Sequence, residues 1–199
     1  MPDPNYDLTT LDEVKTDLEL TTATTYDDIL EALIDAVSNW IENSYCKRQF
    51  LSRPYTEYID GKGNDTIYLK HRPVTAVTTI HDDVDRVFDS NTLINSSEYY
   101  PYENEGYVRL FGETKQFFTR GIFQVGVANV KVVYVAGYET IPKAVNLACR
   151  KLVIKLFRQR EKEGVKSESI GQYSITYTES KDVPTEIKMM LDGYVNMKV

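Results

Sequence analysis

Apolar and polar residues follow a helical period near both ends of the chain and a strand period between them. Apolar side chains recur every three or four residues over 11–19 and over 26–45, a spacing typical of amphipathic helices with one face against a core. Thr10 and Glu13 form a capping-box pattern at the first helix, and Thr25 is a candidate cap of the second. The N-terminal part of the sequence therefore predicts two helices.

After Arg48 the pattern becomes alternating, as in strands that bury one face. Segments 55–59 and 66–69 alternate on either side of 60–65, which is rich in Gly, Asn and Asp, so they predict a β-hairpin. Segment 112–126 is predicted to form a loop. Further short strands are predicted at 74–80, 86–88, 98–100, 107–111 and 129–135. Together the strands predict one small antiparallel domain.

The last third of the chain returns to a helical period. Pro142 stands where a first helical residue is expected, and apolar positions follow at helical spacing until Gly164, which predicts a basic helix over about 142–163. Alternating residues over 170–178 predict one strand, and 183–194 predicts a short final helix.

These elements predict an α+β chain: a small helical bundle with an inserted antiparallel β domain and a C-terminal strand plus a short helix. We expect the second and third helices to pack together, because each carries an apolar stripe that needs cover. The expected parts are the N-terminal helices at 1–48, the inserted β domain at 49–138, the basic helix that completes the bundle at 139–166, and the strand and helix for assembly at 167–199.

The strand at 170–178 has no neighbouring strand in the predicted order. An unpaired strand exposes a row of backbone N–H and C=O groups, so it needs a partner. The inserted sheet could supply that partner, and so could a second copy of the chain. If each copy gives its strand to the next copy, the contact is heterologous and closes into a ring. The candidate residues of this subunit–subunit interface are Ile170, Tyr173, Ile175 and Tyr177.

The formal charge of −7 is unevenly spread along the chain. Residues 1–46 carry eleven acidic side chains against Lys15 alone, whereas 142–166 carries eight basic side chains against two acidic ones. Both regions could simply be solvated helix faces. Alternatively, an acidic helix meets a basic one, within a chain or between copies. The residues for such charge complementarity are Asp28, Glu31, Asp35, Lys151, Lys155 and Arg158.

Residues that could carry catalysis or bind a cofactor are sparse. The histidines His71 and His81 are isolated, and the sequence has no zinc, phosphate-loop or nucleophile motif, so we expect no cofactor, no metal and no catalytic residue. Cys46 and Cys149 fall among the apolar positions of predicted helices, where a thiol is typical of a core. No apolar run approaches the roughly 20 residues of a bilayer span, so we expect a soluble intracellular protein without membrane contact.

The order and spacing of these elements resemble the head-tail connector proteins of long-tailed bacteriophages, which are also called adaptor or head-completion proteins. The strands at 55–60 and 66–73 look like the β insertion that longer members carry. The residues that carry the resemblance are 8–15, 26–30 and 41–46 in the first half, and 134–138, 141–142, 165–177 and 183–184 in the second.

The resemblance implies a structural protein without enzymatic activity. Relatives form a dodecameric ring beneath the portal, at the head-tail interface in the neck of the virion, after assembly in the host cytoplasm. Such a ring extends the DNA channel and provides the platform for tail attachment. The implied partners are the portal protein, copies of the chain itself, a stopper or tail-completion protein, and DNA that passes without specific binding.

In such relatives the C-terminal segment docks on the portal. The residues that correspond to this contact are Ile187, Met190, Leu191 and Tyr194. An alternative function is that of a tail-completion or terminator protein, which would share the ring but not the portal contact. A small metal-dependent hydrolase or nuclease is a less favoured alternative, because the sequence shows no convergent set of ligands.

The excess of carboxylates predicts weak binding to DNA. Tight binding to the phosphate backbone needs many accessible Lys and Arg residues, whereas this chain has a formal charge of −7. Titration of labelled duplex DNA with the full chain at low salt should show weak binding at most, measured by fluorescence anisotropy. Nanomolar affinity near physiological salt would contradict this, and would point to Arg158, Arg160 and Lys162 as phosphate contacts.

Overall fold

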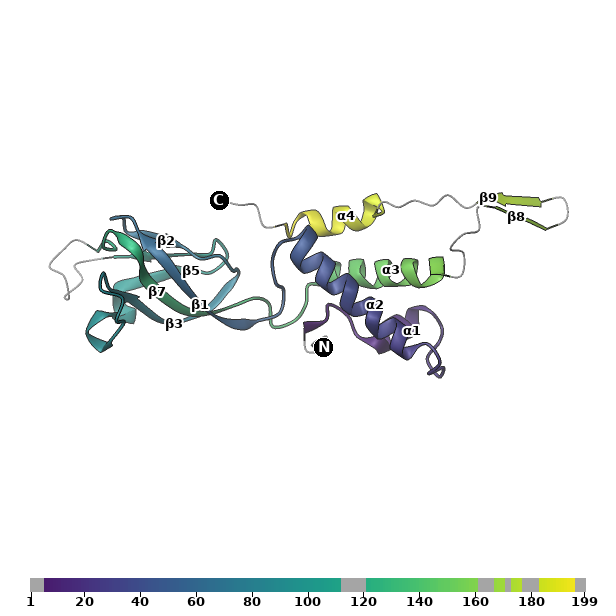
Figure 1. Ribbon diagram of the computed structural model, residues 1–199, viewed down its shortest axis with the longest axis horizontal. Helices are drawn as coiled ribbons and strands as arrows, with labels where there is room; N and C mark the ends of the chain where they lie inside the picture. The colour runs from purple at the N-terminus through teal and green to yellow at the C-terminus, as the bar shows by residue number, and fades with distance from the viewer. Residues whose placement is uncertain (1–5, 112–120, 161–166, 171–172, 177–182, 196–199) are drawn as a thin grey trace. The chain divides into compact units, whose positions relative to one another are not determined.

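The computed structural model describes residues 6–111, 121–160, 167–170, 173–176 and 183–195 (Figure 1). It confirms the α+β fold. The chain divides into two compact units. A helical unit combines Met1–Gln49 with Ile141–Val199, and a β unit comprises Phe50–Thr140.

The helical unit is built from segments at both ends of the chain. Its helices are α1 (Leu11–Asp17), α2 (Asp27–Asn39), which continues as the π-helix η2 (Trp40–Tyr45), α3 (Lys143–Gln159) and α4 (Thr185–Asp192). Helix α3 packs against α1, α2 and α4. Helices α2 and α3 therefore cover each other's apolar faces, as the sequence pattern predicts.

Buried aliphatic side chains and both thiols form the core of the helical unit. Leu30, Val145 and Val153 are fully buried, and so are Cys46 and Cys149. Burial raises the pKa of Cys46 to about 11 and that of Cys149 to about 12, so both remain neutral thiols. The prediction that both cysteines are core residues is confirmed.

The N-terminus of α1 is tied to α3 through one carboxylate. The predicted capping box is present: Thr10 accepts from the backbone N–H of Glu13, whose carboxylate accepts from the backbone N–H of Thr10. The same Glu13 Oε2 accepts from Thr9 Oγ1 at 2.8 Å and from Asn146 Nδ2 at 2.9 Å. Burial alone would raise the pKa of Glu13, but these hydrogen bonds and Arg150 lower it. The cap thus joins two helices that are distant in sequence.

The start of α2 differs from the prediction. Thr25 does not cap it; the N-cap is Tyr26, which makes no capping hydrogen bond with its side chain. The ring of Tyr26 instead meets that of Phe157 edge-on, with centroids 5.5 Å apart. At the N-cap of α2, ring packing against α3 is therefore found instead of the expected capping hydrogen bond. The π-helical turns at its end were not predicted either, because their residues keep the apolar spacing of an ordinary helix.

The basic helix is shorter than predicted. Pro142 is its N-cap and not its first residue, and the helix ends at Gln159 with Arg160 as the C-cap. Segment 161–166 lies outside the described residues. Arg160 lies over the rings of Phe157 and Tyr26, with distances of 3.7 and 4.5 Å from its guanidinium carbon to the ring centroids.

Two antiparallel sheets form the β unit and share one apolar core. The larger sheet has the order β1-β7-β3-β4, with β1 at Arg53–Gly61, β3 at Val74–Asp82, β4 at Leu93–Ile94 and β7 at Gly126–Ala136. The smaller sheet has the order β2-β6-β5, with β2 at Thr66–Tyr68, β5 at Tyr99–Tyr102 and β6 at Tyr107–Leu110. The core between them includes Ile80 and Tyr134 from the larger sheet, Val108 from the smaller one, and Phe123.

The predicted hairpin of 55–59 with 66–69 is wrong. Strand β1 pairs with β7, while β2 pairs with β6 in the other sheet. The intervening turn therefore carries the chain from one sheet to the other. At Gly61 the backbone passes so close to Gln124 that a Cβ would lie 1.8 Å from its carbonyl oxygen. Gly61 thus allows two chain segments to cross closely. The Gly, Asn and Asp content of 60–65 is the same for such a crossing as for a hairpin turn, so composition could not distinguish the two.

The predicted strand at 86–88 is also absent. Arg86 and Phe88 have φ values of 59° and 54°, which interrupt an extended backbone. The Asp83 carboxylate accepts backbone N–H groups from Asp85, Val87 and Phe88 at 2.8 to 2.9 Å, and so folds the segment into a loop. Of the predicted loop at 112–126, residues 112–120 lie outside the described part of the chain.

A buried polar cluster joins strands β1, β3 and β7 and the segment before β7 at one end of the larger sheet. Asn129 is fully buried and accepts from the backbone N–H of Gly61 at 2.8 Å. Its amide donates to Asp82 Oδ1 and to the carbonyl of Gln124, each at 3.0 Å. Asp82 also accepts the N–H of Gln124 at 2.7 Å. Burial raises the pKa of Asp82, although these hydrogen bonds oppose the shift.

We expect Asn129→Ala to lower the free energy of unfolding by about 2 to 4 kcal/mol, because it leaves buried polar groups without partners. Urea unfolding followed by circular dichroism measures this change. Asn104→Ala is the matched control, since Asn104 is exposed and its loss should cost no more than about 0.5 kcal/mol. Equal stability of the two variants would contradict a structural role for the Asn129 cluster.

Candidate functional site

The C-terminal strand has a local partner, contrary to the sequence prediction. Strand β9 (Tyr173–Thr176) pairs antiparallel with β8 (Ser167–Ile170), and Ile170 lies opposite Tyr173. The Ser-Glu-Ser-Ile run of β8 is mostly polar, so the sequence does not predict that it forms a strand paired with β9. Of the predicted interface residues, Ile170, Tyr173 and Ile175 belong to this hairpin, while Tyr177 lies outside the described residues.

The β8–β9 hairpin still leaves strand edges open. Within the described residues it is a sheet of two strands only, with no further strand beside either one. A two-stranded hairpin is marginally stable in water and exposes one row of backbone groups on each outer edge. Any further strand that pairs with β8 or β9 would therefore meet the edge of a hairpin and not a lone strand.

Two of the four predicted portal-binding residues are buried within the chain itself. Ile187 and Leu191 are 2% and 0% exposed, because α4 packs against α3 through its apolar stripe. This burial corrects the expectation that the whole stripe is available to a partner. Met190 and Tyr194 are half-buried, and Met189 is the exposed apolar residue of this helix at 72%.

Polar contacts also hold α4 in place. Tyr45 Oη donates to Asp192 Oδ1 at 2.6 Å, and this hydrogen bond is the main reason that the pKa of Tyr45 rises to about 12. Lys151 on α3 lies 3.4 Å from Glu186 on α4. Ion pairs this exposed contribute little to stability, so apolar burial dominates the attachment of α4.

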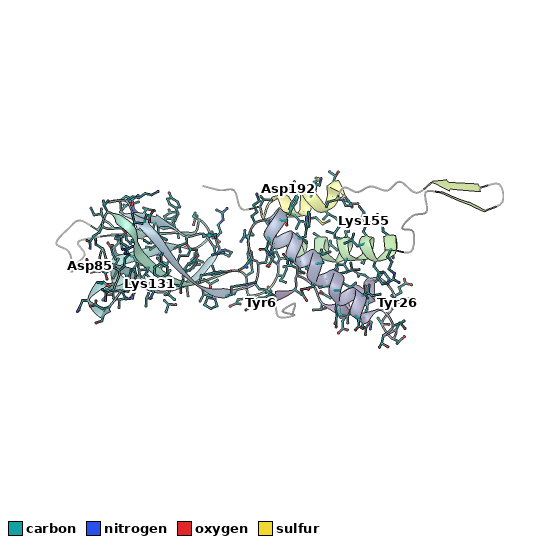
Figure 2. All side chains as sticks on the ribbon, viewed as in Figure 1. Tyr6, Tyr26, Asp85, Lys131, Lys155 and Asp192 are labelled. Carbon is teal, nitrogen blue, oxygen red and sulfur yellow. The ribbon has the colours of Figure 1, made fainter. Side chains whose placement is uncertain are left out.

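The N-terminal acidic region meets the basic helix α3 within the chain, through an ion pair of residues other than the six named from the sequence. Lys151 binds Glu186 of α4, and the ion pair between the N-terminal acidic region and α3 joins Asp17 to Arg150 at 3.3 Å. Lys155 and Asp192 mark the positions of α3 and α4 in Figure 2. Asp28, Glu31 and Arg158 are exposed, and Asp35 and Lys155 are half-buried. The acidic and basic faces thus keep exposed charges that are available to other molecules.

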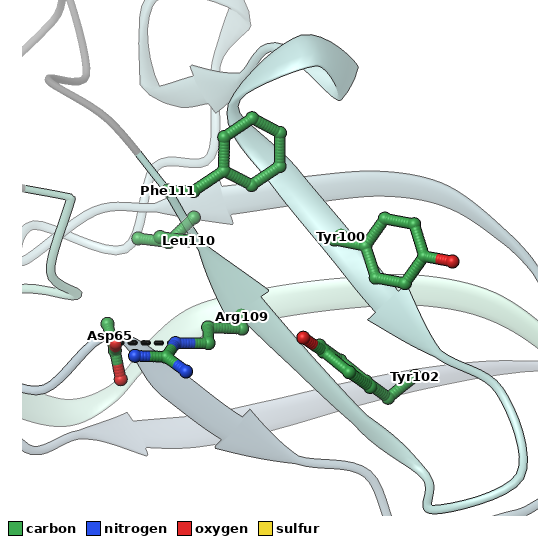
Figure 3. Close-up of a pocket in the computed structure, with 6 residues that line it drawn as sticks. All are labelled: Asp65, Tyr100, Tyr102, Arg109, Leu110 and Phe111. Carbon is green, nitrogen blue, oxygen red and sulfur yellow. Dashed lines mark hydrogen bonds and ion pairs between the residues drawn. The ribbon is translucent and has the colours of Figure 1, made fainter.

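A pocket on the smaller sheet was not predicted from the sequence. It has a volume of about 340 Å³ and is lined by Asp65, Tyr100, Tyr102, Arg109, Leu110 and Phe111. Figure 3 shows Tyr100, Tyr102 and Arg109 at this pocket, with the Arg109 guanidinium directed to Asp65, to which it binds at 2.7 Å. The signal in the sequence was the high tyrosine content, but without the strand register it could not be assigned to one surface.

Both histidines lie in the β unit and contact neighbouring residues there. The His71 ring stacks on Tyr55 with centroids 3.8 Å apart, and burial lowers its pKa despite the nearby Glu57. His81 Nδ1 lies 3.2 Å from the Asp89 carbonyl and from Thr92 Oγ1. Across the described residues, no group of three His, Cys, Asp or Glu side chains is placed to hold a metal ion. None of the described helices has both the length and the apolar character that a bilayer crossing requires.

The attachment of α4 generates a prediction with an internal control. Leu191→Ala should lower the free energy of unfolding of the helical unit by about 3 kcal/mol, because it leaves a cavity beneath α4. Met189→Ala, on the exposed side of the same helix, should change it by no more than about 0.5 kcal/mol. Urea unfolding followed by Trp40 fluorescence measures both, since Trp40 lies 5.3 Å from the ring of Tyr45. Similar effects of the two variants would mean that α4 is not held by this stripe.

Comparison with solved structures identifies a similar fold over the whole chain. A chain in the neck of an empty GTA particle, computed with C6 symmetry, matches with a TM-score of 0.63 and 14% sequence identity. The match covers 100% of this chain and 94% of that one. A search of curated proteins finds no match.

The sequence itself also matches a known family. The model of the family described as "Head completion protein" matches residues 7–197, which include both parts of the helical unit and the inserted β unit. This match confirms the resemblance drawn from the order of helices and strands. The chain belongs to the head completion protein family.

Proposed function

We propose that this chain is a structural head-tail connector, or adaptor, of a phage-like particle. In this proposal copies of the chain form a ring beneath the portal protein in the neck of the virion, after assembly in the host cytoplasm. The ring extends the DNA channel and provides the platform on which a stopper or tail-completion protein and the tail are attached. DNA passes through it without specific binding.

The observation that carries the proposal is the family match over residues 7–197. The fold shared with a chain in a GTA particle neck supports it, because that likeness extends over the entire chain. The C6 symmetry stated for that neck supports a ring of identical copies in this case too, since a sixfold axis accommodates six or twelve subunits. A dodecamer remains the ring size that we propose.

Two surfaces of the helical unit fit contacts in such a ring. The open edges of the β8–β9 hairpin, which include Ile170, Tyr173 and Ile175, suit strand pairing with a neighbouring copy. The outward side of α4, with Met189 exposed and Met190 and Tyr194 half-buried, suits the portal contact. Ile187 and Leu191 contribute to that contact indirectly, because their burial holds α4 against α3.

A structural role without catalysis is part of the proposal. Its support is positive: the family is one of head completion, and the isolated histidines take part in stacking and in contacts within the β unit. No observation favours a hydrolase or nuclease. A tail-completion or terminator protein would also form a ring, and its partner would be the tail instead of the portal.

Removal of the chain from the assembling particle tests the proposal. In a producer that lacks the chain, we expect DNA-filled heads and free tails that fail to join, counted by electron microscopy. Supplying the full chain from a second copy of its gene should restore joined particles. In the same cells, a tagged full chain should copurify with the portal protein. Copurification with tails alone would favour the terminator function, and normal joining without the chain would refute both.

A further inference from the structure

One face of the smaller sheet is lined by tyrosines. The strand register places Tyr68 of β2 opposite Tyr107 of β6, and Tyr107 opposite Tyr102 of β5. In the next row with the same orientation, Tyr100 lies opposite Arg109. We refer to Tyr68, Tyr100, Tyr102, Tyr107 and Arg109 as the tyrosine face.

These rings contact one another in a continuous series. The Tyr102 and Tyr107 rings stack with centroids 4.3 Å apart, while the Tyr68–Tyr107 and Tyr100–Tyr102 centroids are 5.7 and 5.2 Å apart. Tyr68 and Tyr100 are nevertheless each 59% exposed, and Phe111 beside them is 52% exposed. Tyrosine and arginine are among the residues enriched at the energetic centres of protein interfaces, because they give a large contact area with polar ends. The face therefore has the composition of a protein-binding surface.

The electrostatics of the tyrosine face disfavour an anionic ligand. Its one guanidinium, that of Arg109, is paired with Asp65 at 2.7 Å. Glu103 and Glu105, in the turn that joins β5 to β6, are both exposed at the other end of the face. The pKa of Tyr107 is raised by burial and by nearby groups that include Tyr102 and Glu105. A basic partner fits this surface, whereas a nucleic acid backbone does not.

Helix α3 presents a surface with the complementary chemistry. Leu147, Lys151, Ile154 and Arg158 are spaced four, three and four residues apart, so they follow one face of the helix. Lys151 and Arg158 are exposed and alternate with Leu147 and Ile154, which are half-buried, and Lys151 lies 3.4 Å from Glu186 of α4. We refer to these four residues as the outer α3 stripe. Cationic side chains over tyrosine rings add favourable cation–π contacts, and aliphatic side chains cover the ring faces.

We infer that the tyrosine face of one copy binds the outer α3 stripe of a second copy. The inference rests on the proposed ring. The two surfaces lie on different units of the same chain, so their pairing between copies is heterologous and can continue from subunit to subunit until the ring closes. The β insertion thereby acts as a lateral clamp between subunits, with Glu103 and Glu105 placed to meet Arg158.

Photo-crosslinking in assembled particles tests this contact. Tyr100 is replaced by p-benzoylphenylalanine in the full chain, and the particles are irradiated and analysed by mass spectrometry. We expect a product in which position 100 is joined to α3 of another copy. The matched control is the same replacement at Tyr58, which is 56% exposed but lies on the larger sheet. A product with another neck protein or with DNA, or no product beyond the control, would overturn the inference.

The same particles separate this inference from the proposed function. If the chain is present in the neck but position 100 gives no product with a second copy, the clamp is wrong and the connector function stands. If the chain is absent from the neck, the connector function is wrong.

Charge exchange provides a second, independent readout. Glu103→Lys together with Glu105→Lys should lower the yield of the product about tenfold, since truncation or reversal at an interface centre commonly costs that much affinity. Adding Arg158→Glu should restore most of the yield, because opposite charges then face each other again. Adding Lys47→Glu, an exposed charge of the helical unit outside α3, is the control and should restore nothing. Failure of Arg158→Glu to restore the product would show that the stripe is not the partner of these glutamates.

Discussion

The pairing of β1 with β7 is the interaction on which the rest of the structure depends. These strands are the first and the last long strands of the β unit, and they pair from Arg53 opposite Ala136 to the far end of the sheet. Next to this pair, Ser52 donates to the Tyr138 carbonyl at 3.0 Å and Tyr138 donates to the Phe50 carbonyl at 2.7 Å. The chain therefore enters and leaves the β unit at one place. Only with the insertion closed in this way can α2 and α3 meet, although 103 residues, 40–142, lie between them in the sequence.

One glycine permits this closure. Gly137 has φ of +119°, and a Cβ there would lie 2.6 Å from the Leu51 carbonyl oxygen. Any other residue would push the two segments apart where they cross. Because the closure is local, the helical core forms from its own apolar stripes, and the β unit forms from a separate core of its own. An insertion of this kind can change in sequence or length while the helical unit keeps its packing.

The sequence was sufficient for those features that depend on local patterns. The Thr10–Glu13 cap, the apolar stripes of α2 and α3 and the burial of Cys149 follow from spacing along one segment, and the α+β class follows from them. Strand pairing did not follow, because Gly61 marks a crossing between sheets and β8 is too polar to be recognised as a strand. The direction of the α4 stripe was also hidden, since an amphipathic helix can bury the same face against its own chain or against a partner.

The tyrosine face was hidden for a related reason. Tyr68 comes from one strand, Tyr100 and Tyr102 from another, and Tyr107 from a third, so their common surface exists only once the register is known. The composition shows that tyrosine is abundant. It does not show whether the tyrosines lie on one surface or are spread over several. Binding surfaces that are assembled across strands are in general less visible in a sequence than caps and helical stripes.

The two buried thiols have a consequence for the durability of the protein. Disulfide exchange and oxidation proceed through the thiolate, and both Cys46 and Cys149 are held as neutral thiols away from solvent. A protein made in a reducing cell and later carried into an oxidising medium would thus keep the same covalent structure in both. The two core thiols would therefore stay reduced when the redox conditions around the protein change.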